Sequence, residues 1–131
     1  MRKPPQQIRL AWATADLRGV VAFYRELLDA AVIAEFNDHS GFDGAILSLG
    51  SDAYHLEFTY DRANAQRFRR SHDDLLVLYV EDEGDWRDLE QRIAAMGLST
   101  VASANPWWDA HGVTIEDPDG RRIVLNRGAW R

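Results

Sequence analysis

The sequence predicts an α+β fold built from two consecutive βαβββ modules. Apolar residues with the two-residue period of a strand are followed by apolar residues with the spacing of a helix, and then by further short apolar runs. The same order recurs in the second half of the chain, and 131 residues suit one compact domain. We therefore expect a duplicated α+β domain.

The first module is predicted to begin with a strand at 8–14, where large and small side chains alternate. Asp16 follows as a helix N-cap, and apolar residues then recur at helical spacing as far as about Ala30. Turn-forming residues separate the next apolar runs. Three further strands are expected around Ala31–Phe36, Ala45–Leu49 and Tyr54–Thr59.

The second module is predicted to repeat this order. A strand at Leu75–Glu81 precedes a helix that ends at Gly97. The Asp-Pro-Asp-Gly turn at 117–120 favours a hairpin between the last two strands. The strands expected after the helix lie at Leu98–Val101, Gly112–Glu116 and Arg121–Asn126.

These elements divide one domain, residues 1–131, into module 1 (8–60), a linker (61–72) and module 2 (73–127). Neither four-stranded sheet can bury both of its faces alone, so we expect the modules to pair. Paired sheets would form a curved mixed sheet around a shared cavity that encloses a small ligand. The pairing could occur within one chain or across two.

Charge and composition exclude several kinds of partner. The chain has 21 acidic and 15 basic residues, a net charge of -6, which argues against nucleic acid and against a membrane surface. The absence of cysteine excludes disulfides, thiolate metal ligands and a cysteine nucleophile. No long apolar run follows the N-terminus, so we expect a cytoplasmic location.

Several local motifs occur in an order typical of one known superfamily. They are Ala15-Asp16-Leu17, Ala22-Phe23-Tyr24-Arg25-Glu26-Leu27-Leu28, His55-Leu56-Glu57-Phe58, Val80-Glu81-Asp82 and Glu116-Asp117-Pro118-Asp119-Gly120. With the duplicated element order, they resemble the vicinal oxygen chelate superfamily of glyoxalases, bleomycin-resistance proteins and extradiol dioxygenases. The resemblance implies the glyoxalase/bleomycin resistance/dihydroxybiphenyl dioxygenase-like fold and a homodimer.

Metal-using members of that superfamily hold a divalent ion with side chains from the first and last strands of each module. The resemblance places Arg9 at the first of these positions, Glu57 at the second, Leu75 at the third and Val124 at the fourth. A guanidinium has only donors and stays protonated, and aliphatic groups do not coordinate metals. We therefore expect no metal cofactor; any divalent ion would depend on Glu57, joined by Asp74 if the register shifts by one.

Strand alternation places Arg9 and Glu57 on the faces opposite their apolar neighbours, where they are expected to face the cavity and to pair. Two interpretations stay open: a structural ion pair, or a clamp that binds an anionic ligand. His55 shares the face of Glu57. Both are candidate catalytic residues, His55 as a general base, although a structural histidine is the simpler interpretation.

Other candidate ligand-binding residues lie in the second module. Trp107 and Trp108 occupy a loop and could stack on a ligand, or one of them could plug the core or a dimer interface. Tyr79 and Asn126 are expected on cavity-facing positions, where they would form hydrogen bonds with a ligand.

The leading functional hypothesis is metal-independent binding of a small, partly apolar ligand by a glyoxalase/bleomycin-resistance-like homodimer. The alternative is a metal-dependent lyase, isomerase or dioxygenase that uses Glu57, and a third is a structural dimerisation module. The sequence does not identify the ligand and does not show whether the protein is an enzyme.

Overall fold

The computed structural model describes residues 2–65 and 71–130. The chain forms two compact units, unit 1 at residues 1–69 and unit 2 at residues 70–131. Residues 66–70, which belong to the predicted linker, lie outside the described part of the chain. Each unit is described by itself.

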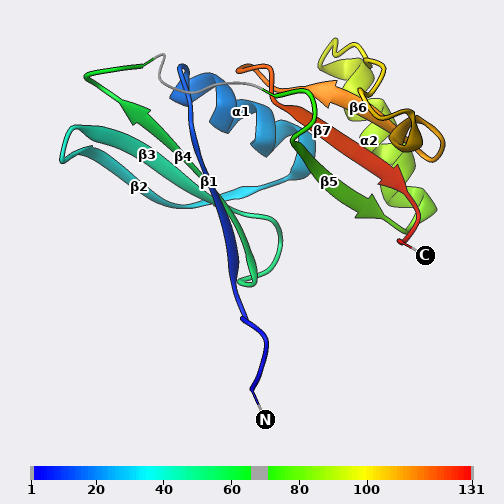
Figure 1. Ribbon diagram of the computed structural model, residues 1–131, viewed down its shortest axis with the longest axis horizontal. Coiled ribbons are helices and arrows are strands. Elements are labelled where there is room, and N and C mark those ends of the chain that lie inside the picture. Colours follow the sequence, from blue (N-terminus) through cyan, green and yellow to red (C-terminus); the bar gives the residue numbers. More distant parts are fainter. Residues whose placement is uncertain (1, 66–70, 131) are drawn as a thin grey trace. The chain divides into compact units, whose positions relative to one another are not determined.

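Unit 1 is a four-stranded sheet with one helix (Figure 1). The strands follow the order β1-β4-β3-β2, with β1 parallel to β4 and the remaining pairs antiparallel. This confirms the predicted order of strand, helix and three strands. The elements are β1 (Ile8–Ala13), α1 (Leu17–Leu28), β2 (Ala31–His39), β3 (Phe42–Ser48) and β4 (Tyr54–Asp61).

Helix α1 begins and ends where local chemistry favours it. The Asp16 carboxylate accepts a hydrogen bond from the backbone N–H of Gly19 at 2.9 Å, as expected of an N-cap. Asp29 ends the helix in the left-handed conformation, with φ 54°. The ring of Tyr24 stacks on that of Phe58 from β4, with centroids 5.1 Å apart, so α1 covers one face of the sheet.

Unit 2 is a three-stranded sheet of order β5-β7-β6 with helix α2 (Figure 1). Strand β5 runs parallel to β7, and β6 and β7 form the predicted hairpin. The buried side chains of α2 are Trp86, Leu89 and Ile93. The elements are β5 (Leu75–Val80), α2 (Glu83–Ala95), the 3-10 turn η1 (Pro106–Asp109), β6 (Gly112–Glu116) and β7 (Arg122–Arg127).

The prediction of a strand at Leu98–Val101 is wrong, because only an isolated bridge forms there, between Val101 and Thr114. Directly after this bridge, side chains bind the next backbone groups. The carboxylate of Asp109 accepts the backbone N–H of Ser103 at 3.2 Å, and Arg122 Nη1 donates to the carbonyl of Ala102 at 3.0 Å. Side-chain hydrogen bonds of this kind replace ladder bonds, so the bridge does not continue as a strand beyond Val101.

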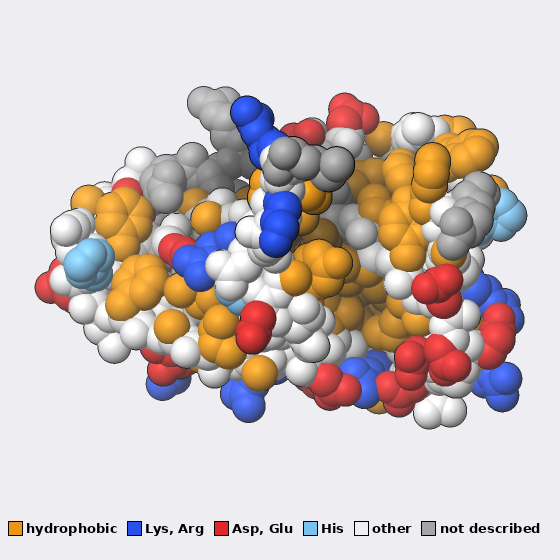
Figure 2. All heavy atoms as spheres, turned by 90° about the horizontal axis from the view of Figure 1, so that it is seen from below, with side chains coloured by type: hydrophobic (Ala, Val, Ile, Leu, Met, Phe, Trp, Pro, Cys, Tyr) orange, Lys and Arg blue, Asp and Glu red, His pale blue; other side chains and the backbone are white. Residues whose placement is uncertain are grey.

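No helix in the described ranges 2–65 and 71–130 is long and apolar enough to cross a membrane. On the face drawn in Figure 2, basic and acidic side chains are interspersed with apolar ones. This mixed distribution agrees with the modest acidic net charge of the sequence.

Candidate functional site

Three of the predicted site residues lie together on one face of the sheet in unit 1. In the parallel pair of β1 and β4, Arg9 lies opposite His55, and Ala11 lies opposite Glu57. Side chains two residues apart on a strand share a face, so His55 and Glu57 project on the same side. The intervening Leu56 is buried on the opposite face, the one that α1 covers.

The guanidinium of Arg9 bridges the other two groups. Its Nη1 donates to Oε1 of Glu57 at 3.0 Å, and its Nη2 lies 3.4 Å from Nδ1 of His55. The predicted pairing of Arg9 with Glu57 is therefore confirmed. The side chains of Arg9 and Glu57 are 43% and 19% exposed, whereas His55 is buried, with 9% of its surface exposed.

This geometry determines the form of the histidine. Arginine can only donate, so Nδ1 of His55 accepts and its proton lies on Nε2. In that tautomer Nε2–H is a donor. The cluster of Arg9, His55 and Glu57 (the polar cluster) thus combines an ion pair with an imidazole.

The polar cluster retains unused hydrogen-bonding capacity. Among the described residues, Oε2 of Glu57 and Nε2 of His55 have no hydrogen-bond partner, and no buried side-chain nitrogen or oxygen is left without one. Those two atoms therefore reach solvent. Arg9 uses two of the five N–H donors of a guanidinium in the contacts with Glu57 and His55.

Apolar side chains continue the same sheet face beside the polar cluster. Glu57 pairs across the antiparallel ladder with Ile46 of β3, and Ile46 pairs with Ala34 of β2. Ile46 is half-buried and Ala34 is exposed. One face of unit 1 thus presents a polar corner next to an accessible apolar strip.

The predicted site residues of unit 2 form two groups within that unit. Tyr79 and Asn126 are direct register partners on β5 and β7, so the structure brings them side by side. Tyr79 is 41% exposed and Asn126 is half-buried, so both side chains remain accessible. Trp107 and Trp108 lie on η1, where Trp107 is 68% exposed and Trp108 half-buried. Neither ring is buried, which disfavours a role as a plug of the core.

The residues at the four positions that the superfamily resemblance assigns to a metal do not fit a divalent ion. Arg9 is bonded to the one carboxylate available, Glu57, while Leu75 and Val124 are aliphatic. Asp74, the alternative in a shifted register, is exposed and precedes β5. Within residues 2–65 and 71–130, no group of three or more histidine, aspartate or glutamate side chains is arranged to hold a metal.

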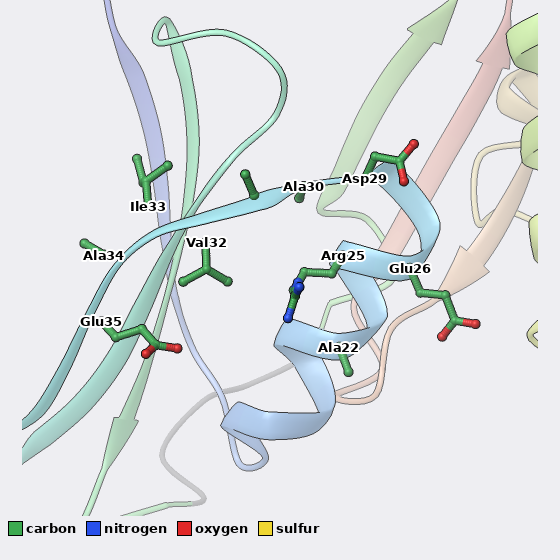
Figure 3. A pocket seen from close by; sticks show the side chains of 10 residues that line it. Ala22, Arg25, Glu26, Asp29, Ala30, Val32, Ile33, Ala34 and Glu35 are labelled. Atoms are coloured by element: carbon green, nitrogen blue, oxygen red, sulfur yellow. The ribbon is translucent and has the colours of Figure 1, made fainter.

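Sequence reasoning missed an open groove between α1 and β2 (Figure 3). It encloses about 1020 Å³, and the Arg25 side chain extends from α1 toward β2. Small side chains leave this space open, and the alanines at 22, 30, 31 and 34 were the available signal. The predicted clamp residues Arg9 and Glu57 do not line it.

Comparison with known proteins connects this fold to one family. The model of the YycE-like N-terminal domain matches residues 8–59, and that of the YycE-like C-terminal domain matches residues 73–127. The uncharacterized protein YycE of Bacillus subtilis (strain 168) is 42% identical over 119 residues, which is 91% of this chain and 86% of that protein.

Solved structures agree with this assignment. A crystal structure of a Bacillus subtilis YycE protein of unknown function, described as a candidate glyoxalase/fosfomycin resistance protein, superposes with a TM-score of 0.86 at 38% identity. The match covers 97% of this chain and 92% of that chain.

More distant structures show the fold alone. The trypanothione-dependent glyoxalase I of Leishmania major gives a TM-score of 0.70 at 18% identity, covering 97% and 88% of the two chains. The fosfomycin resistance protein FosX of Mesorhizobium loti gives 0.67 at 13% identity, covering 98% and 94%. Both have the fold that the motifs predicted. The chain belongs to the YycE-like family and has the fold of the vicinal oxygen chelate superfamily.

Proposed function

We propose that this YycE-like protein binds a small, partly apolar molecule without a metal ion, and that Arg9 and Glu57 form the polar end of the binding site. The observation that supports this most directly is the 3.0 Å ion pair between them. It occupies two positions that the superfamily resemblance assigns to metal ligands, and the guanidinium cannot coordinate a cation.

The surroundings of the pair favour binding over a purely structural role. An exposed ion pair contributes little to stability, and the side chain of Arg9 is 43% exposed. Ile46 and Ala34 extend the same face with apolar surface that a ligand could cover. Within unit 2, the residues Tyr79, Asn126, Trp107 and Trp108 are proposed as ligand contacts of their own, and a cytoplasmic homodimer is part of the same proposal.

Two measurements test the proposal together. Protein purified without chelator should contain far less than one equivalent of nickel, zinc, manganese or iron by elemental analysis. A thermal-shift screen of small carboxylates, amides and aromatic compounds should give stabilising ligands in chelated buffer. A near-stoichiometric metal bound through Glu57 would overturn the proposal.

The second candidate is a metal-dependent lyase, isomerase or dioxygenase. It is favoured by one observation, that His55 and Glu57 project from the same face of β4. It predicts that a divalent ion creates activity toward glyoxalase or ring-cleavage substrates, and that Glu57→Gln abolishes it. Activity that stays at background with and without metal eliminates this candidate.

The third hypothesis, a structural dimerisation module, makes a different prediction. Substitution of Arg9 would change stability or dimerisation, and the thermal-shift screen would find no ligand. A single ligand that loses affinity in Arg9→Gln, with the oligomeric state unchanged, eliminates it.

A further inference from the structure

The polar cluster places hydrogen-bond donors beside a hydrogen-bond acceptor, and this arrangement restricts the chemistry of a ligand. The Nε2–H of His55 is a donor, the free N–H groups of Arg9 are donors, and Oε2 of Glu57 is an acceptor. We infer that the site binds a monocarboxylate whose neighbouring carbon carries a hydroxyl or amino group. The inference rests on the proposed function.

The anionic end of the ligand is assigned by charge. A carboxylate can take two hydrogen bonds from the donors that Arg9 leaves unused, which is the strong geometry for this pair. The same carboxylate is repelled by Glu57, so it should lie on the His55 side of the guanidinium. Because the positive charge of Arg9 is already paired with Glu57, the polar cluster suits one negative charge better than the two charges of a phosphate monoester.

The donor group of the ligand is assigned by the remaining acceptor. Oε2 of Glu57 reaches solvent and has no partner among the described residues. An O–H or N–H on the carbon next to the carboxylate would reach it while the carboxylate stays on Arg9. A ligand that lacks this donor would cover the oxygen and leave it unsatisfied, which weakens binding.

The apolar side chains on the neighbouring strands indicate where the apolar part of the ligand would lie. The strand order places β1 and β4, with the polar cluster, next to β3. Ile46 of β3 lies beside Glu57 in the ladder, and Ala34 of β2 follows. From β1 toward β2, the ligand would therefore carry its carboxylate first, then the hydroxyl or amino group, and then a compact apolar substituent.

A matched set of phenyl compounds tests each group separately. Mandelate carries the carboxylate, the hydroxyl and the ring; mandelamide lacks the charge, and phenylacetate lacks the hydroxyl. Dissociation constants would be measured by NMR titration of the full chain in chelated buffer. We expect mandelate to bind roughly tenfold or more tightly than mandelamide, and about threefold to tenfold more tightly than phenylacetate.

Two variants localise the effect. Arg9→Gln should remove the preference for mandelate over mandelamide. Arg62→Gln is the control, because Arg62 is also ion-paired, in the same unit, and its side chain is 47% exposed. It should keep the preference, and the NMR spectrum of each variant reports whether it is folded.

The inference is overturned if mandelate and mandelamide bind equally, if Arg9→Gln retains the preference, or if mandelate does not bind at millimolar concentration. The proposed function fails on different grounds, a stoichiometric metal or the absence of any ligand in the screen. Tight binding of neutral compounds at Arg9 would reject the carboxylate and leave metal-independent binding in place.

Discussion

The double-mutant cycle of Arg9→Gln and Glu57→Gln measures what the central ion pair contributes to folding. Two unit charges 3.0 Å apart attract each other by about 1.4 kcal/mol in water. Salt screening and the entropy of holding two long side chains reduce this value. Since Arg9 is 43% exposed, we expect a coupling free energy of about 0.5–1 kcal/mol.

Urea unfolding of the wild type, both single variants and the double variant gives the coupling directly. A fully enclosed ion pair would behave differently, because removal of one partner leaves an uncompensated charge and costs about 3–5 kcal/mol. If Arg9→Gln lowers the free energy of unfolding by that amount, the pair is a structural substitute for a metal. The reasoning that treats it as an accessible clamp is then refuted.

Three further predictions address packing, pH and the exposed tryptophan. In Gly44→Ala the added Cβ would lie 2.2 Å from the Phe36 ring, so we expect the free energy of unfolding, measured with urea, to fall by about 1–2 kcal/mol. The additional substitution Phe36→Ala removes the clash and should restore most of this loss. The hydrogen bond from Arg62 lowers the pKa of Asp43 below its ordinary value of 3.8. The folded state is therefore stabilised above the ordinary pKa, where Asp43 is ionised, and this stabilisation is lost as the pH falls through the lowered pKa. Asp43→Asn should therefore flatten the pH dependence of the free energy of unfolding in the acid range below about pH 5, and an unchanged profile contradicts this assignment. Trp107→Ala should change stability by less than about 0.5 kcal/mol, since the side chain is 68% exposed, but should weaken the best ligand of the screen; unchanged affinity removes Trp107 from the site.

The parts of the fold that the sequence predicted are those set by local chemistry. Asp16 identifies the start of α1, and the apolar spacing of Trp86, Leu89 and Ile93 identifies the buried face of α2. Such signals lie within a few residues of the element they define. The strand expected at Leu98–Val101 is reduced to the bridge between Val101 and Thr114. The side chains of Asp109 and Arg122, which follow later in the sequence, bind the next backbone groups, those of Ser103 and Ala102.

The same distinction separates what was predictable in the polar cluster. Strand alternation predicted that Arg9 and Glu57 lie on the faces of their strands opposite the apolar neighbours, and the structure shows the two residues as an ion pair. The contact between Arg9 and His55 was not predicted, because it depends on the register of a parallel pair whose strands are more than forty residues apart. That register follows from the packing of Leu56 and Phe58 under α1, which no local pattern specifies.

In the proposed site an arginine stands where the resemblance places a metal ligand, and this changes the kind of molecule that the face would recognise. A divalent cation attracts electron pairs from several directions, whereas a guanidinium offers N–H donors in one plane and therefore selects planar oxygen pairs. Beside Arg9, Glu57 keeps one oxygen available to accept a hydrogen bond. The pair thus presents a donor plane and an acceptor side by side, and we expect it to select a ligand by hydrogen-bond geometry and not by affinity for a metal.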